Sequence, residues 1–307
     1  MRTRQVLVVA AVASIVPFVL GQGCPSFGGA AQQSPSDLTA LERQAVAVAC
    51  LAPGGLGQAT DVTRNATGNL LSGGAQQGAP PATGDSAALG VTFGTCPTVT
   101  QSASIGDGIA VQLAIDFGTE PCQALPEITD LNYNCSGKAT GTFDLINKAI
   151  SLSYQNISCN QKTLNGTANV GFDLLPLGVG LEGQWDLAWY PGQQAISTNG
   201  SAAVRYALVV GCCDTLSIQQ FSGTISNEGT QWSVTMTDVV ISLEHYGSHI
   251  PYSGTLVVDN DQIRPITIIF NATSPVTEQV SVQIEGGPAF TVTLSQLAEW
   301  ATILFGG

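Results

Sequence analysis

Basic side chains are scarce in this sequence. Its 307 residues include 9 Lys and Arg against 22 Asp and Glu, which gives a formal net charge of −13 at pH 7. Proteins bind the negative phosphate backbone of nucleic acids through clustered Lys and Arg. Because the few basic residues form no cluster, we expect no nucleic acid partner.

Motifs for catalytic and metal centres are also missing. The sequence has no Cys-x-x-Cys pair and no Gly-x-Ser-x-Gly, which are typical of thiol or zinc sites and of serine hydrolases. Its only histidines, His245 and His249, flank Gly247, so a loop is expected there instead of a metal-binding helix. Asp259-Asn260-Asp261 lacks the later Gly and Glu of a calcium loop and is typical of a turn. We therefore expect no catalytic residue, no metal and no cofactor.

One enzymatic alternative stays open. A glycosidase needs two suitably placed carboxylates, and the fold could bring together any two of the 22 acidic residues. No pair stands out in the sequence, so a non-enzymatic protein is the first expectation and a glycosidase-like hydrolase an alternative.

The N-terminus has the pattern of an export signal. Arg2 and Arg4 precede an uncharged apolar run over 6–20, and small residues follow it. The run is shorter than the about 20 residues of a membrane span. We therefore predict a cleaved signal peptide over 1–23.

The residues around Cys24 indicate how the exported chain is anchored. A small residue directly before a Cys is typical of bacterial lipoprotein signals, although Leu20 lies four residues before Cys24 instead of the usual three. Lipidation of Cys24 is the first prediction, and ordinary cleavage after Gly21 or Gly23 is the alternative. Either route predicts an exported protein, in the bacterial envelope (outer membrane or periplasm) or secreted, with a membrane partner if Cys24 is acylated.

Eight cysteines in an exported chain favour disulfides. Cys135 and Cys159 lie symmetrically about Asn147, inside a turn-like segment. A hairpin centred there would bring the two sulfurs together. We predict a Cys135–Cys159 disulfide.

A second pair of cysteines flanks another expected hairpin. Cys96 and Cys122 lie on either side of Gly106-Asp107-Gly108, which is typical of a turn. Because the two cysteines are offset from the centre of that turn, a loop must close the gap before a Cys96–Cys122 disulfide forms. The partners of the other cysteines stay open: Cys50, Cys212 and Cys213.

The remainder of the sequence indicates a β-rich domain between two helices. Residues 36–50 predict an amphipathic helix that is capped by Ser36 and ends at Pro53-Gly54, followed by a Gly/Ala/Pro-rich linker to residue 90. Apolar and polar residues then alternate along many short segments, which is typical of half-buried strands. Examples are the apolar sets Val111, Leu113, Ile115, Phe117 and Ala168, Val170, Phe172, Leu174. A last helix is expected over 295–305.

These patterns predict an all-β fold, mainly an antiparallel meander that forms a sandwich or barrel-like sheet, with a short helix at each end. The predicted organisation is a signal peptide over 1–23, a helix and linker over 24–90, and a β-rich domain over 91–307. A weak internal echo, in which 141–167 resembles 223–255, suggests two similar β units, 91–180 and 181–307. Chance similarity between β segments is the alternative.

Part of this β region resembles a known group of proteins. The relevant stretch runs Ile115-Asp116-Phe117-Gly118, Cys122, Cys135-Ser136-Gly137-Lys138, Gly141-Thr142 and Asn165-Gly166-Thr167. It resembles uncharacterised bacterial envelope lipoproteins over about 50 residues. The resemblance implies export and a β-sheet fold, and it implies no known activity.

Two tryptophans are the best sequence candidates for ligand contacts. Trp185 and Trp189 share one face of a predicted strand and would form a sugar-stacking platform if they faced solvent. Packing in the core is the alternative. The sequence thus favours a structural or binding role in the envelope, with a carbohydrate-binding or adhesive module as the alternative and a polysaccharide or another envelope component as partner.

Overall fold

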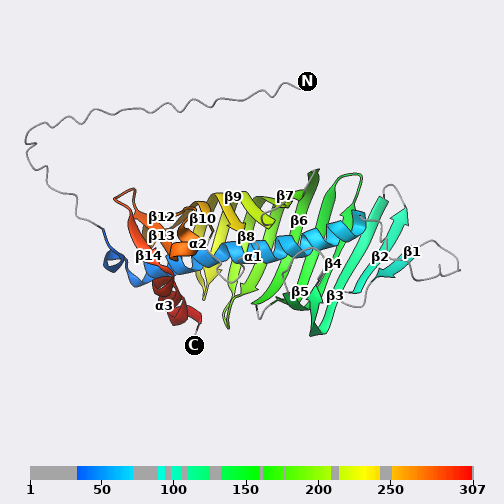
Figure 1. Ribbon diagram of the computed structural model, residues 1–307, viewed down its shortest axis with the longest axis horizontal. Coiled ribbons are helices and arrows are strands. Elements are labelled where there is room, and N and C mark those ends of the chain that lie inside the picture. The colour runs from blue at the N-terminus through cyan, green and yellow to red at the C-terminus, as the bar shows by residue number, and fades with distance from the viewer. Residues whose placement is uncertain are drawn as a thin grey trace, which may run out of the picture. The chain divides into compact units, whose positions relative to one another are not determined.

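A single antiparallel sheet dominates the molecule. The computed structural model describes residues 33–71, 89–93, 98–105, 109–124, 133–159, 162–175, 178–208, 214–242 and 251–305. Within these residues, 14 strands pair in chain order, so that each strand lies beside its neighbours in the sequence. This meander confirms the mainly antiparallel, all-β fold with a helix at each end that the sequence predicts (Figure 1).

The helices and strands have the following bounds. The helices are η1 Pro35–Asp37, α1 Ala40–Leu71, α2 Ser274–Thr277 and α3 Leu294–Phe305. The first seven strands are β1 Leu89–Phe93, β2 Thr98–Ile105, β3 Ile109–Ala124, β4 Tyr133–Asp144, β5 Ala149–Cys159, β6 Lys162–Leu175 and β7 Gly178–Tyr190. The other seven are β8 Ile196–Leu208, β9 Asp214–Asn227, β10 Thr230–Ser242, β11 Ser253–Asn260, β12 Ile263–Phe270, β13 Gln279–Ile284 and β14 Phe290–Thr293.

Alternation of side chains gives the sheet an apolar inner face and a polar outer face. The predicted inward set of β3 is confirmed, because Val111, Leu113, Ile115 and Phe117 are all buried. The same pattern assigns Leu174 to the inner face of β6, but this residue is exposed. Burial along this strand ends at Phe172.

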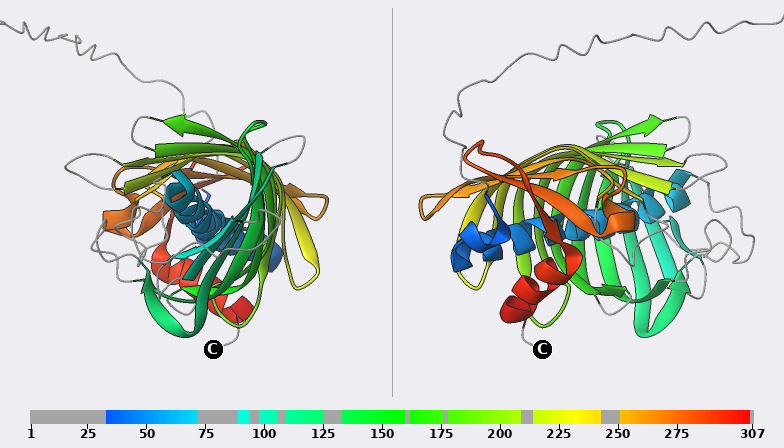
Figure 2. Two further views of the ribbon diagram at one scale, coloured as in Figure 1. Left: turned by 90° about the vertical axis from the view of Figure 1, so that its right-hand side faces the viewer. Right: turned by 60° about the vertical axis from the view of Figure 1, so that its left-hand side comes forward.

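Helix α1 lies inside the curve of the sheet. Viewed end-on, the strands bend around the helix (Figure 2), and α1 contacts β6 to β9, β11, β12 and α3. Every residue from Ala45 to Cys50 is buried. These six consecutive positions point in all directions around a helix with 3.6 residues per turn, so α1 is enclosed on every side there. Helix and sheet therefore share one core.

The extent of α1 differs from the sequence prediction. The cap is Thr39 instead of Ser36, since Thr39 Oγ1 accepts a hydrogen bond from Glu42 N at 3.2 Å and Glu42 Oε2 accepts one from Thr39 N at 2.8 Å. The helix also continues through Pro53 to Leu71. Residues 53–71 are thus helical. Of the rest of the predicted linker, residues 72–88 lie outside the described residues and residues 89–90 belong to β1.

Burial explains why Pro53 does not end α1. A Pro inside a helix costs about 3 kcal/mol relative to Ala, and each Gly costs about 1 kcal/mol. The segment around Pro53 also contains Gly54, Gly55 and Gly57, so it is a poor helix by itself. Because the surrounding sheet buries Ala52, Leu56 and Ala59, packing offsets these costs.

At the other end of the chain, α3 agrees with the helix predicted over 295–305. It packs on α1 and β14, and Arg43 of α1 lies 6.0 Å from the centre of the Trp300 ring. This distance is within the range of cation–π attraction. The two helices therefore meet near the start of α1.

The two echoed segments of sequence share a backbone feature. Asn156 in β5 and Asp238 in β10 both have positive φ angles, of 48° and 51°, and the register of their strands shifts at each position. A glycine with positive φ faces each of them, Gly137 and Gly254, and a Cβ there would lie within 2.5 Å of the facing backbone oxygen. Both segments belong to one continuous sheet, which is not divided into two units. An internal duplication therefore stays a prediction.

Candidate functional site

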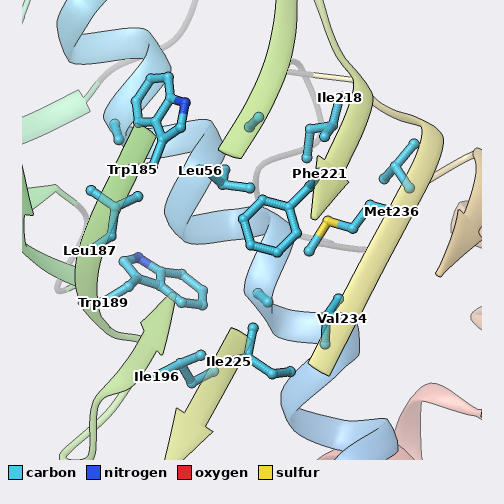
Figure 3. Packing of buried hydrophobic residues seen from close by; sticks show 14 of the residues in the cluster. Leu56, Trp185, Leu187, Trp189, Ile196, Ile218, Phe221, Ile225, Val234 and Met236 are labelled. Atoms are coloured by element: carbon cyan, nitrogen blue, oxygen red, sulfur yellow. The ribbon is translucent and has the colours of Figure 1, made fainter. Parts of the chain in front are cut away.

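The two tryptophans that the sequence singles out lie in the core. Trp185 and Trp189 of β7 are both buried, and Figure 3 shows their indole rings on the side of the sheet that faces α1. Alternation correctly places them on one face, but that face is covered by the helix. The solvent-facing sugar platform that these residues would form is therefore not present, and core packing is their role.

Small residues of α1 make room for Trp189. A Cβ on Gly54 would lie 2.8 Å from Trp189 Cη2, and a Cβ on Gly55 would lie 3.0 Å from Trp189 Cβ. Both distances are shorter than normal carbon–carbon contacts. The Gly54-Gly55 pair is thus a notch in the helix that receives the indole, which gives these residues a packing reason to be glycine.

Gln58 joins α1 to three strands at the same place. Its Nε2 donates to the carbonyl oxygens of Ile157 and Lys162, each at 3.1 Å. Its Oε1 accepts from Trp189 Nε1 at 2.9 Å. Lys162 Nζ lies 6.0 Å from the Trp189 ring centre, and burial lowers the pKa of this amine to about 8.

A second hydrogen-bonded group lies further along α1. Tyr154 OH and Thr63 Oγ1 are 2.8 Å apart, and Thr63 Oγ1 also donates to Ala59 O at 2.8 Å. Burial raises the pKa of the Tyr154 hydroxyl, so it stays protonated. Both groups hold the helix in the sheet.

The start of α1 is held by charge. Glu42 is 1% exposed, and its carboxylate accepts hydrogen bonds from Arg264 Nε at 2.7 Å and Arg264 Nη2 at 2.8 Å. Arg264 Nη2 also donates to Asp37 O at 3.1 Å. The hydrogen bond from Arg264 lowers the pKa of Glu42 from 4.5 to about 2. Sequence analysis missed this pair, because 222 residues separate its members.

The predicted Cys135–Cys159 disulfide is confirmed. The two residues are partners across β4 and β5, whose hairpin turns at residues 145–148 as the symmetry about Asn147 implies. Such a bond is typical of an oxidising compartment. Cys50 has a free thiol that is buried, and burial raises its pKa to about 12, which leaves it unreactive as a nucleophile.

The other cysteine predictions are untested. Cys24, Cys96, Cys212 and Cys213 lie outside the described residues. The backbone of Cys122 pairs with that of Cys135, and the hairpin expected at 106–108 is consistent with the pairing of Ile105 and Ile109 beside it. The Cys96–Cys122 disulfide and the lipidation of Cys24 therefore stay predictions.

Three features of the described part of the chain bear on metal binding and membrane spans: the turn after β11, the placement of acidic, Cys and His side chains, and the helices. Asn260 Oδ1 accepts hydrogen bonds from Gln262 N and Ile263 N. The predicted turn is therefore present, but it lies at Asp261 and Gln262, because Asp259 and Asn260 still belong to β11. Among the described residues, no group of three or more His, Cys, Asp or Glu is placed to hold a metal. His245 and His249 lie outside them. No helix within them combines the length and hydropathy that a membrane span requires.

The outer face of the sheet carries a continuous row of uncharged side chains. One residue from each strand from β2 to β13 lies opposite the next in register, and each is exposed or half-buried. This outer row consists of Ser102, Gln112, Thr142, Ser151, Asn169, Gln184, Ser201, Ser222, Thr235, Val257, Thr267 and Gln283.

The chemistry of the outer row differs from that of the chain as a whole. Although the chain has a net charge of −13, the row contains no charged residue, and Val257 is its one apolar member. Its hydroxyls and amides both donate and accept hydrogen bonds, and neighbouring strands lie about 4.8 Å apart. The outer row is thus a repeating, neutral hydrogen-bonding surface, and the sheet pairing that creates it is not visible from any single strand.

Comparisons with known proteins give no further indication. No family model matches this chain, and neither a curated protein nor a solved structure matches it.

Proposed function

We propose that this chain is an exported protein of the bacterial envelope, anchored by lipid on Cys24, with a non-enzymatic binding role. The export signal over 1–23 and the small residue before Cys24 support the address. The Cys135–Cys159 disulfide supports an oxidising compartment.

The outer row is the observation that supports binding as the role. A ligand for this surface needs many hydroxyl or carbonyl groups. It should carry no strong charge, because the row contains no charged side chain that could pair with it. A neutral polysaccharide has this chemistry and repeats along its length, as the row does along the sheet. Each hydrogen bond contributes only about 0.5–1.5 kcal/mol net, so useful affinity comes from many contacts at once.

Depletion from solution by insoluble neutral polysaccharides, such as cellulose and chitin, tests this role. The variant Asn169→Ala/Gln184→Ala removes two neighbouring amides from the row. The control Gln193→Ala/Gln262→Ala removes two exposed amides from turns outside it. We expect about tenfold weaker binding for the first variant and no change for the control. Equal binding by both variants, or no binding by the parent chain to any such polymer, would contradict the proposed ligand.

The envelope location and the lipid anchor are tested separately, by the intact mass of the protein purified from its native host. A chain that begins at Cys24 and carries a diacyl or triacyl increment is expected. An unmodified N-terminus would make the protein a secreted one and would leave the binding role standing by itself.

A further inference from the structure

Among the residues that the structure describes, few large apolar side chains are exposed, and three of them lie at one end of the sheet. In the described residues, five such side chains are exposed: Leu145 40%, Ile146 62%, Leu174 58%, Val257 37% and Val276 85%. Single exposed apolar residues are normal on protein surfaces, whereas a contiguous group indicates a contact surface. Three of the five, Leu145, Ile146 and Leu174, belong to one such group.

Hydrogen bonds and register bring these three residues to the same end of the sheet. Leu145 and Ile146 lie in the β4–β5 turn, and Leu174 lies near the end of β6. The backbone of this turn is joined to β6 by a hydrogen bond from Phe172 N to Lys148 O at 2.9 Å. Lys148 Nζ also lies 3.2 Å from Asp173 Oδ1. We call Leu145, Ile146 and Leu174 the β4–β6 tip.

Several polar groups of the turn are paired within the turn itself. Asp144 Oδ1 accepts hydrogen bonds from Ile146 N at 3.0 Å and Asn147 N at 2.9 Å. Asn147 Nδ2 donates to Asp144 Oδ2 at 2.7 Å. A backbone N–H that enters a water-poor environment costs free energy unless it has such a partner. Two backbone N–H groups of the turn are therefore satisfied before any contact with a lipid surface.

We propose that the β4–β6 tip inserts into the boundary between headgroups and acyl chains of a zwitterionic lipid bilayer. This inference rests on the envelope location proposed above. A stable protein–protein interface buries about 800 Å² on each partner, which three side chains at a turn cannot supply. Interfacial insertion needs only a few apolar side chains, and it would hold this end of the sheet against the bilayer to which the lipid on Cys24 attaches the chain.

Charge decides the kind of bilayer. At the tip, Lys148 pairs with Asp173, and the carboxylate of Asp144, which is hydrogen-bonded to neutral N–H groups, adds a negative charge. The chain as a whole carries a net charge of −13 and is repelled by anionic lipids. A zwitterionic surface has no such penalty, so the apolar contact decides binding there.

The test is co-sedimentation of the full chain with phosphatidylcholine vesicles. All variants carry Cys24→Ser, so that no acyl chain is present, and any contribution of the N-terminal segment is the same in each. Ile146→Ser/Leu174→Ser removes two apolar side chains from the tip, and Val276→Ser removes the most exposed apolar side chain that lies elsewhere. A third variant, Ile146→Trp, adds a side chain that favours the bilayer interface and keeps the test valid if the serine variant folds poorly.

We expect the tip variant to lower the vesicle partition coefficient about 100-fold, which is about tenfold for each side chain. The valine control changes it less than threefold, and Ile146→Trp raises it with a blue shift of the added fluorescence. An equal loss in both serine variants, or no loss in either, overturns the proposal. Dimers in vesicle-free buffer that the tip variant abolishes would instead assign the tip to a second copy of the chain. Because Cys24 is replaced throughout, these results are independent of the mass measurement that tests the lipid anchor.

Discussion

The two halves of α1 are held in the sheet by different chemistry. Near its start, the buried carboxylate of Glu42 binds the Arg264 guanidinium of β12. Further along, neutral groups hold the helix, because Gln58 bonds to Trp189 and to two backbone carbonyls. The first attachment depends on an ionised carboxylate and the second does not. Acid should therefore loosen the start of α1 before it affects the middle.

The comparison also shows where the stability of α1 comes from. Its middle contains Pro53 and the Gly54-Gly55 notch, which disfavour a helix by several kcal/mol in total. The same glycines are what allow Trp189 to pack against the helix. Intrinsic helix preference and core packing therefore oppose each other at this point, and packing wins.

Replacing Trp189 should have the largest effect. Trp189→Ala removes a buried indole that contacts the notch and donates to Gln58, so we expect unfolding to become about 3–5 kcal/mol easier. Urea denaturation measures this change.

A matched comparison is Trp185→Phe with Trp189→Phe. Trp185 Nε1 is buried without a hydrogen-bond partner in the described structure, so Trp189→Phe should cost about 1 kcal/mol more.

A double-mutant cycle tests whether the notch exists to receive Trp189. In the parent chain, Gly54→Ala should destabilise by about 1–3 kcal/mol because the new Cβ would lie 2.8 Å from Trp189 Cη2 of the indole ring. In a Trp189→Ala background the collision is absent, and the same change should stabilise the chain by about 1 kcal/mol through better helix preference. An effect of the same sign in both backgrounds would show that the notch has another cause.

The charged attachment should come next in size. Glu42→Gln removes the charge that binds Arg264, and a pKa lowered from 4.5 to about 2 corresponds to about 3 kcal/mol at neutral pH. Glu182→Gln on the exposed outer face is the control and should change stability by less than about 0.5 kcal/mol.

The pH dependence of this pair has a definite direction. Since the folded-state pKa is depressed, the contribution of Glu42 is complete above pH 4.5 and is lost as pH falls toward 2. The stability difference between the parent and Glu42→Gln should therefore shrink over that range. A difference that stays constant from pH 7 to pH 2.5 would show that the carboxylate does not act through its charge.

Alternation and local symmetry were enough to predict the strands and one disulfide. Inward residues such as Ile115 repeat every second position, and Cys135 and Cys159 are equidistant from one turn, so both predictions depend only on nearby sequence. The end of α1 was predicted wrongly for a physical reason. Pro and Gly end helices in solvent, whereas here the sheet encloses them. The signal available in the sequence was the high content of Ala and Gly around Pro53, because small residues suit a helix that is enclosed by large side chains.

The candidate sites depend on pairing between distant parts of the chain. Strand periodicity places Trp185 and Trp189 on one face, but it cannot say that α1 covers that face. Nor can it identify Arg264 as the partner of Glu42. The outer row needs the register of every strand pair before Asn169, Gln184 and their neighbours become one surface. Local sequence thus identifies elements, and sites that span elements require the fold.

The smallest expected effect comes from the neutral hydrogen-bonded group further along α1. Tyr154→Phe removes a hydroxyl that bonds to Thr63, while Thr63 Oγ1 keeps its bond to Ala59 O. We expect a loss of about 1 kcal/mol, measured by urea denaturation. Because Tyr154 stays protonated throughout, this loss should be the same at pH 7 and pH 3, unlike that of Glu42→Gln. A loss that changes with pH as strongly as the Glu42 effect would mean that the two halves of α1 are released together, and the contrast between charged and neutral attachment would fail.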